Sequence, residues 1–320
     1  MYYCIKQLPS HELKKIIKIG TRESQLAVWQ ATLVQNLLLE NNVASELVYI
    51  KSEGDIDTVT PLYEIGVQGI FTKSLDAALI NNRIDIAVHS LKDVPTKLAV
   101  GIQLAAVLER ASYKDIFVYK DDYSFLGDTN SSAIIATSST RRKAQWLHKF
   151  PNHHFENLRG NVNTRLRKIN EHNWNGAIFA AAGLERINIR PASSIDLDWM
   201  VPAPAQGAIG IVCRTSDKFS FEISNALNDD TTALCTKIER DFLRTLLGGC
   251  STPISALAVI ENDTVNFKGN VCSPDGKQKI EMEKTTSMQS SDELGKVAGN
   301  ELLKNEEVQK LIYRLTNAEK

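Results

Sequence analysis

Along the first hundred residues, short apolar segments typical of strands alternate with segments in which apolar residues recur at the spacing of a helix. The segment IIKIG is short and apolar, as in a buried strand, and a polar turn from Thr21 to Ser24 follows it. The next apolar residues recur every three or four positions, which predicts an amphipathic helix with a face of Leu26, Trp29, Leu33, Val34 and Leu37. ELVYIK and IDIAVHS predict strands, and FTKSLDAALI predicts a helix. This alternation indicates an α/β lobe with parallel strands.

The same pattern restarts near residue 114. Strands are predicted in DIFVYK, IIATS, HHFENLR and GAIFAAAG, with helices starting near Thr140 and Val162. A proline-rich segment, RPASSIDLDWMVPAPAQG, follows this second lobe. The strand AIGIVCR behind it has no α/β unit of its own, so we expect it to return to the first sheet.

A third pattern begins near residue 230. It predicts the helix TALCTKIERDFLRTLL, the turn GGCSTP and the strands ISALAVI, TVNFKGNV and QKIEMEKT before C-terminal helices. The sequence therefore predicts an N-terminal extension over residues 1–15 and three domains. We expect domain 1 from 16–108 and 208–225, domain 2 from 114–201, and a smaller α+β domain 3 from 230–320.

Composition narrows the functional classes. The chain has 320 residues, 43% of them hydrophobic and 23% charged, with a formal net charge of -1. These values are ordinary for a globular protein and do not suit a surface built to hold a polyanion. Because neither a membrane-spanning apolar run nor a secretory signal pattern is recognisable, we expect a cytoplasmic protein without membrane association.

Metal and disulfide chemistry are not favoured. The five cysteines are scattered and lack the close pairs typical of zinc sites, and no HExxH motif occurs. His153 and His154 are interpreted as surface residues of an edge strand. We therefore expect no metal.

Polar residues follow the strand IDIAV, at the position where α/β sheets bind ligands. They are His89, Ser90, Lys92 and Asp93, and Pro95 ends the segment. A carboxylate beside a lysine can move a proton or hold a cation while the lysine holds an anion. A solvated turn is an equally acceptable interpretation of this segment taken alone.

Basic and hydroxyl groups follow other predicted strands as well. Free N–H groups at helix starts and guanidinium groups favour a ligand with several carboxylates or phosphates. The residues in these positions are Arg22, Ser24, Ser138, Ser139, Thr140, Arg141, Arg142, Arg159, Gly160, Asn161, Arg165 and Arg167. No P-loop and no GxGxxG motif accompanies them, so nucleotide cofactors are disfavoured.

Cys250 lies in a glycine-lined turn, Leu247-Gly248-Gly249-Cys250, after a predicted helix. The glycines leave space for a bulky group to approach the sulfur. Taken alone, the motif favours an inert thiol behind a helix C-terminus.

Seven segments together resemble the successive signatures of the porphobilinogen deaminase family. They are IGTRESQLA, IDIAVHSLKDVPT, ATSSTRRKAQ, LRGNVNTRL, AAAGLERI, PAPAQGAIGI and LGGCSTPI. The resemblance implies two α/β lobes similar to type II periplasmic binding proteins plus a smaller α+β domain. It also implies an enzyme that deaminates and joins four porphobilinogen molecules head to tail into hydroxymethylbilane, in tetrapyrrole and heme biosynthesis. A monomer is the family expectation.

The resemblance also assigns roles to residues. It implies a dipyrromethane cofactor joined by a thioether to Cys250, and Asp93 as the catalytic carboxylate that stabilises pyrrole nitrogens and the cationic azafulvene. The implied contacts to the cofactor's acetate and propionate groups come from Lys92, Ser139, Arg141, Arg142 and Arg165. Those to the substrate come from Arg22, Ser24, Arg159 and Arg186. Gln68 and Ser74 replace the family's usual lysine and glutamate in a loop that retains Lys73.

Two other function classes use the same residues. A two-lobed receptor without catalysis would need the lobes and the arginines, but not Cys250 and Asp93. An RNA-binding protein would use SSTRRK and RGNVNTRLRK, yet neither segment carries the aromatic residues on which bases stack. Both alternatives are weaker than the enzyme.

Overall fold

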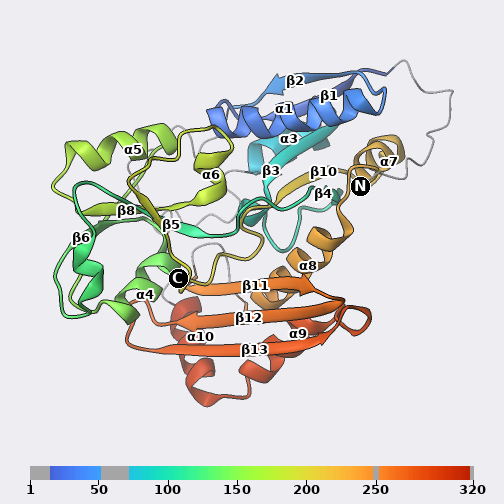
Figure 1. Cartoon of the computed structure of the whole chain (residues 1–320). Helices are drawn as coiled ribbons and strands as arrows, with labels where there is room; N and C mark the ends of the chain where they lie inside the picture. Colours follow the sequence, from blue (N-terminus) through green and yellow to red (C-terminus); the bar gives the residue numbers. More distant parts are fainter. Residues whose placement is uncertain (1–14, 52–71, 248–251, 318–320) are drawn as a thin grey trace. The chain divides into compact units, whose positions relative to one another are not determined.

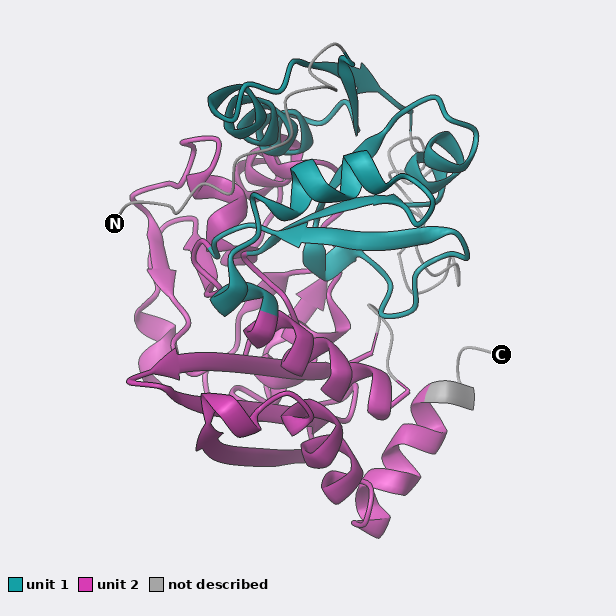
Figure 2. Cartoon of the chain, turned by 90° about the vertical axis from the view of Figure 1, so that its right-hand side faces the viewer, with its two compact units in different colours: residues 1–56, 69–110, 208–233 teal, residues 57–68, 111–207, 234–320 magenta. Residues whose placement is uncertain are grey.

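Two compact units make up the chain (Figure 2). The structure, a computed structural model, describes residues 15–51, 72–247 and 252–317. Of these, unit 1 contains 15–51, 72–110 and 208–233, and unit 2 contains the rest. Each unit buries its own hydrophobic clusters.

Unit 1 is built on a five-stranded sheet with the order β2-β1-β3-β10-β4. β1 pairs in parallel with β2 and β3, whereas β10 pairs antiparallel with β3 and β4. The segment AIGIVCR is β10, so it returns to the first sheet as expected. The elements of the unit are β1 (Ile17–Thr21), α1 (Gln25–Glu40), β2 (Ser45–Tyr49), α3 (Lys73–Ile80), β3 (Ile86–Ser90), η1 (Leu91–Asp93), β4 (Ile102–Val107), β10 (Ile209–Arg214) and α7 (Lys218–Asn225).

Helix α1 packs on this sheet through a narrower face than its sequence suggests. Ala31, Val34 and Leu38 are fully buried against the strands. The predicted face residues Trp29, Leu33 and Leu37 are only partly buried at its margin. The spacing of apolar residues thus predicted the helix correctly. Which of those residues are buried depends on how α1 packs against β3.

Unit 2 contains a second five-stranded sheet with the order β7-β6-β8-β5-β9, of which Figure 1 labels β6, β8 and β5. β6 pairs in parallel with β7 and β8, and β5 is antiparallel to β8 and β9. The strand β9 lies in the proline-rich segment and forms one edge of this sheet. The elements are β5 (Asp115–Tyr119), η2 (Ser124–Gly127), β6 (Ile134–Ala136), α4 (Thr140–Lys149), β7 (His154–Glu156), α5 (Val162–Glu171), β8 (Gly176–Ala180), α6 (Ala181–Glu185) and β9 (Ser194–Asp196).

The two five-stranded sheets share one topology. In each, three parallel strands are followed by an antiparallel strand that separates them from the last strand. In each sheet the antiparallel strand lies outside the stretch of chain that forms the three parallel strands. β10 follows the second sheet in the chain, whereas β5 precedes β6, β7 and β8. This repeated topology confirms the predicted class of two α/β lobes.

The C-terminal part of unit 2 is an antiparallel three-stranded sheet, β11-β12-β13, covered by helices (Figure 1). Phe242 of α8 and Phe267 of β12 meet edge to face in its core, with ring centroids 5.1 Å apart. This part confirms the predicted α+β region, whereas the division of unit 2 into domains 2 and 3 stays a prediction. The elements are α8 (Asp230–Thr245), β11 (Ile254–Glu261), β12 (Thr264–Cys272), β13 (Lys279–Ser287), η3 (Met288–Ser290), α9 (Leu294–Leu302) and α10 (Glu306–Asn317).

The crossing of α8 and α9 provides a stability test. A Cβ atom at Gly295 would overlap the carbonyl oxygen of Ile238, whereas one at Gly127 would meet nothing within 4 Å. We expect Gly295→Ala to lower the free energy of unfolding by about 1–3 kcal/mol, because backbone atoms must separate. Gly127→Ala is the matched control and should change it by less than about 0.5 kcal/mol. Equal urea midpoints for the two variants would contradict the described packing.

Candidate active site

In unit 1, site candidates cluster at one edge of the sheet. β1 and β3 are parallel, so their carboxyl ends share that edge. Arg22 and Ser24 follow β1, and Lys92 and Asp93 lie in η1, directly after β3. The Ser24 hydroxyl accepts a hydrogen bond from the Ala27 N–H at 3.4 Å, capping α1. Both lysine and aspartate are half-buried, as expected for groups at a ligand site.

His89 and Ser90 take structural positions at the end of β3. The Gln30 amide donates to the Ser90 hydroxyl at 2.9 Å, which joins α1 to β3. His89 is buried, and burial together with the positive charge of Arg22 lowers the pKa of its imidazole to about 4. His89 is therefore neutral at physiological pH and supplies no charge to this edge.

In unit 2, the corresponding edge collects the predicted arginines. β7, β6 and β8 are parallel, and Arg159 follows β7 while Arg186 follows α6, just beyond β8. The Nε of Arg165 on α5 donates to the Gly160 carbonyl at 2.7 Å, and Arg159 is 5% exposed. Arg159 thus lies in the connection between β7 and α5, Arg165 on α5 itself, and Arg186 at the end of α6.

Arg186 is held by the loop that precedes β10. Its Nη2 donates to the Gly207 carbonyl at 2.7 Å. Gly207 has a φ of 87°, and a Cβ there would approach the Ala111 carbonyl to 2.6 Å, so only glycine fits without strain. Burial lowers the pKa of Arg186 to about 10, which is the direction expected of a desolvated cation that a nearby anion would stabilise.

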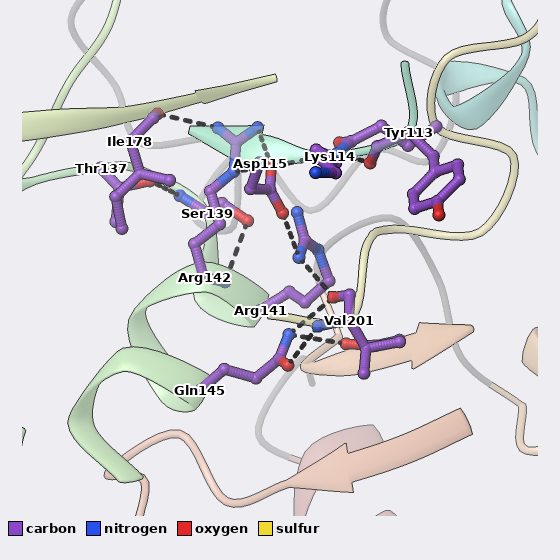
Figure 3. Close-up of polar contacts among 12 residues, drawn as sticks. Tyr113, Lys114, Asp115, Thr137, Ser139, Arg141, Arg142, Gln145, Ile178 and Val201 are labelled. Atoms are coloured by element: carbon purple, nitrogen blue, oxygen red, sulfur yellow. Dashed lines mark hydrogen bonds and ion pairs between the residues drawn. The ribbon is translucent and has the colours of Figure 1, made fainter. Parts of the chain in front are cut away.

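Asp115 joins Arg141 and Arg142 in a buried cluster (Figure 3). Its carboxylate forms two ion pairs: Arg141 Nη1 lies 2.8 Å from one oxygen, and Arg142 Nη2 lies 2.7 Å from the other. Asp115 is the first residue of antiparallel β5 and pairs with Ala180, the last residue of β8. An antiparallel strand thus delivers a carboxylate to the same edge that the parallel strands supply with arginines.

The two arginines of this cluster differ in their contacts. Arg142 also donates through Nε to Asp115 at 2.9 Å and through Nη1 to the Ile178 carbonyl at 3.0 Å. Arg141 donates from Nη1 to the Val201 carbonyl at 2.9 Å. Ser139 caps α4 by accepting from the Arg142 N–H at 3.4 Å. Arg142 therefore has a structural role in joining α4 to β5 and β8, in addition to its predicted role in cofactor binding.

Sequence reasoning missed Asp115 and misplaced one histidine. The only signal for Asp115 was a charged residue opening the otherwise apolar strand DIFVY. His153, expected at the surface, is buried, because Trp146 Nε1 donates to its Nδ1 at 2.9 Å. His154 is exposed on β7 as predicted.

The described cysteines are all buried. Cys213, Cys235 and Cys272 carry free thiols inside the core. Burial raises the pKa of the Cys213 thiol and raises that of Cys272 to about 12. The predictions for Cys250 and Gln68 lie outside the described residues, while Lys73 and Ser74 open α3.

Two further searches of the described residues gave negative results. They contain no group of three or more histidine, cysteine, aspartate or glutamate side chains placed to hold a metal ion. Within the same residues, no helix combines the length and apolarity needed to cross a membrane.

Comparison with known families decides the identity. Residues 17–222 match the profile described as "Porphobilinogen deaminase, dipyromethane cofactor binding domain", and residues 233–304 match "Porphobilinogen deaminase, C-terminal domain". The chain belongs to the porphobilinogen deaminase family. The predicted family, its enzyme class of transferase and its dipyrromethane cofactor are thereby confirmed.

Individual relatives agree with this family. The porphobilinogen deaminase of Chloroherpeton thalassium is 40% identical over 291 residues, covering 88% of this chain and 92% of the relative. The chloroplastic porphobilinogen deaminase of Pisum sativum is 42% identical over 311 residues, covering 93% and 84%. Among solved structures, a nutrient-binding protein of Burkholderia cenocepacia bound to methionine aligns with a TM-score of 0.42 and 14% identity, over 68% of this chain and 93% of that one.

The residues at the sheet edge of unit 2 fit a ligand with the carboxylates of the family's cofactor. A dipyrromethane carries acetate and propionate groups, which need several cationic or N–H donors, and guanidinium groups bind carboxylates through paired hydrogen bonds. In unit 2, Arg159 and Arg186 are largely withdrawn from water, so their charges are desolvated in advance. Such an edge suits a polycarboxylate better than a neutral ligand.

His89 gives a testable pH dependence. Because the folded chain binds its proton only near pH 4 and the unfolded chain near 6.5, stability should fall as pH drops through that window. The free energy of unfolding should fall by on the order of 3 kcal/mol across this window, because each unit of pKa difference corresponds to about 1.4 kcal/mol. We expect His89→Gln to remove this slope between pH 6.5 and 4 in urea titrations, and His154→Gln, at an exposed position, to retain it. Parallel slopes for the two variants would show that His89 is not the titrating group.

Proposed function

We propose that this chain deaminates porphobilinogen and joins four molecules head to tail into hydroxymethylbilane, a step of tetrapyrrole synthesis. The observation that carries the proposal is the match to both family domains, combined with arginines that follow the three parallel strands β6, β7 and β8 of one sheet. Porphobilinogen bears two carboxylates per pyrrole, so each added unit brings two more negative charges. A largely neutral protein handles such a ligand by concentrating cations locally.

Arg22, Ser24, Arg159 and Arg186 are proposed to hold the substrate's carboxylates. Lys92, Ser139, Arg141, Arg142 and Arg165 are proposed to hold those of the cofactor. The helix-capping serines can do both tasks, because a hydroxyl accepts from the helix N–H while donating its own proton to a carboxylate. When bound, the cofactor would supply a covalently held pyrrole as the acceptor for substrate units.

Asp93 is proposed as the catalytic carboxylate. Loss of ammonia from the aminomethyl group of porphobilinogen leaves a positive charge spread over the pyrrole ring and its nitrogen. A half-buried carboxylate on a short, rigid 3₁₀ turn can accept the pyrrole N–H and stabilise this charge as it develops. Pro95, two residues later, limits the turn's freedom.

Cys250 is proposed as the residue that carries the cofactor. The burial of Cys213, Cys235 and Cys272 supports this choice, because a buried thiol admits no bulky group and a raised thiol pKa disfavours the reactive thiolate. Cys4 lies outside both segments that match the family. A monomeric state and a cytoplasmic location are part of the same proposal.

The catalytic role is tested with Asp93→Asn. We expect turnover of porphobilinogen to fall at least about a hundredfold, because the neutral amide cannot offset the developing charge, while the mass of the bound cofactor remains. Asp121→Asn, at an exposed position, is the matched control and should keep normal turnover. Turnover within twofold of the parent in Asp93→Asn would remove this residue from the mechanism.

The attachment site is tested by intact mass and peptide mapping. Cys250→Ser should yield folded protein without the added mass of two linked pyrroles, because a hydroxyl does not replace the thiolate. Cys213→Ala should keep both the added mass and the activity, since Cys213 is buried in the core of unit 1. An adduct that persists in Cys250→Ser would assign the tether to another residue.

A further inference from the structure

Gln145 forms a buried polar junction on α4, one helical turn after Arg141. Its Nε2 donates to the Val201 carbonyl at 2.9 Å and to the Ser255 hydroxyl at 2.9 Å. Its Oε1 accepts from the Val201 N–H at 3.0 Å and from Asn270 Nδ2 at 3.4 Å. Two donated and two accepted bonds use the full capacity of one amide, and the side chain is 2% exposed.

Val201 connects this junction to Arg141 (Figure 3). The Val201 carbonyl accepts from both Gln145 Nε2 and Arg141 Nη1, and the same Arg141 nitrogen lies 2.8 Å from Asp115. Because a guanidinium is planar, a hydrogen bond and an ion pair at one nitrogen restrict the direction of its other N–H groups. The position of Val201 therefore sets the orientation of Arg141, and Gln145 holds both backbone groups of Val201.

The junction also extends to the third sheet. Ser255 lies on β11 and Asn270 on β12, and the Ala256 N–H on β11 donates to the Pro202 carbonyl at 3.2 Å. The segment 201–202 is thus held between α4 and the strand that begins at Ile254, four residues after Cys250. One amide side chain links an arginine of the site to the strand that follows the proposed tether.

We propose that Gln145 is a positioning residue, which orients Arg141 toward the cofactor's carboxylates by clamping Val201. The inference rests on the proposed function, in which Arg141 binds a carboxylate of the dipyrromethane. Gln145 needs no contact with a ligand for this role. Its effect reaches the ligand through the Val201 carbonyl and the Arg141 guanidinium.

The test is a double-mutant cycle between Gln145 and Arg141 in the cofactor-loaded enzyme. Gln145→Met keeps the side-chain length but removes all four hydrogen bonds, and Gln145→Glu keeps the acceptor while losing both donated bonds. For each we expect kcat/KM for porphobilinogen, per cofactor-bearing molecule, to fall on the order of tenfold, as misplaced binding groups do. In an Arg141→Gln background, either substitution should cause less than about a twofold further loss, because Gln145 acts through Arg141.

Ser255→Ala is the matched control. It removes one bond of the same amide and destabilises the same junction, but leaves the clamp on Val201 intact. We expect its kcat/KM to stay within about twofold of the parent, at a loss of unfolding free energy that urea titration measures separately. Equal loss of activity in Ser255→Ala and Gln145→Glu, or full additivity with Arg141→Gln, would reduce Gln145 to a structural residue.

The cycle separates this inference from the proposed function. Full activity and full cofactor mass in Arg141→Gln would overturn the assignment of Arg141, and the inference with it. A large loss in Arg141→Gln beside an unchanged Gln145→Glu would overturn the positioning role alone.

Discussion

The ion cluster around Asp115 is the constraint on which the site edge of unit 2 depends. Burying two guanidinium groups without a counter-charge costs several kcal/mol per ion, so Arg141 and Arg142 can leave water only beside this carboxylate. Gln206 Nε2 also donates to the same carboxylate at 3.0 Å. Two cations against one anion leave the cluster with a net positive charge. The arrangement thus satisfies the fold and still leaves an edge that attracts carboxylates.

The residues that cap helices at the sheet edges stabilise the fold and also lie where the ligand is proposed to bind. Ser24, Ser139 and Asn161 each accept a hydrogen bond from the first turn of the helix they open. Such caps typically contribute about 1 kcal/mol each. They also fix the backbone from which the basic side chains start, before any ligand binds. This preorganisation lowers the entropy cost of holding a flexible, highly charged pyrrole chain.

The spacing of apolar residues predicted the sheets and the returning strand. The rule that α/β sheets bind ligands beyond the carboxyl ends of their strands predicted where the basic residues lie. They predicted less about what each side chain contacts. Asp115 lies 26 residues before Arg141 in the chain and Gln145 lies 110 before Ser255, and no local pattern records such pairings. The burial of His153 was missed for a different reason: the turn after α4 stacks its ring on Phe150, with centroids 5.0 Å apart, and places its Nδ1 to accept from Trp146 Nε1. The role of Cys250 came from resemblance to the family alone.

The late position of β10 has a consequence for how the chain matures on the ribosome. β4 is complete at Val107, yet its partner β10 is synthesised only at Ile209–Arg214, after the whole second sheet has emerged. The nascent chain therefore carries an open sheet with an unpaired strand while its second lobe can already close. Long-range pairing of this kind is slow, and exposed strand edges promote aggregation. Translation speed and chaperone access over residues 108–208 therefore bear on how much of the chain reaches the folded state.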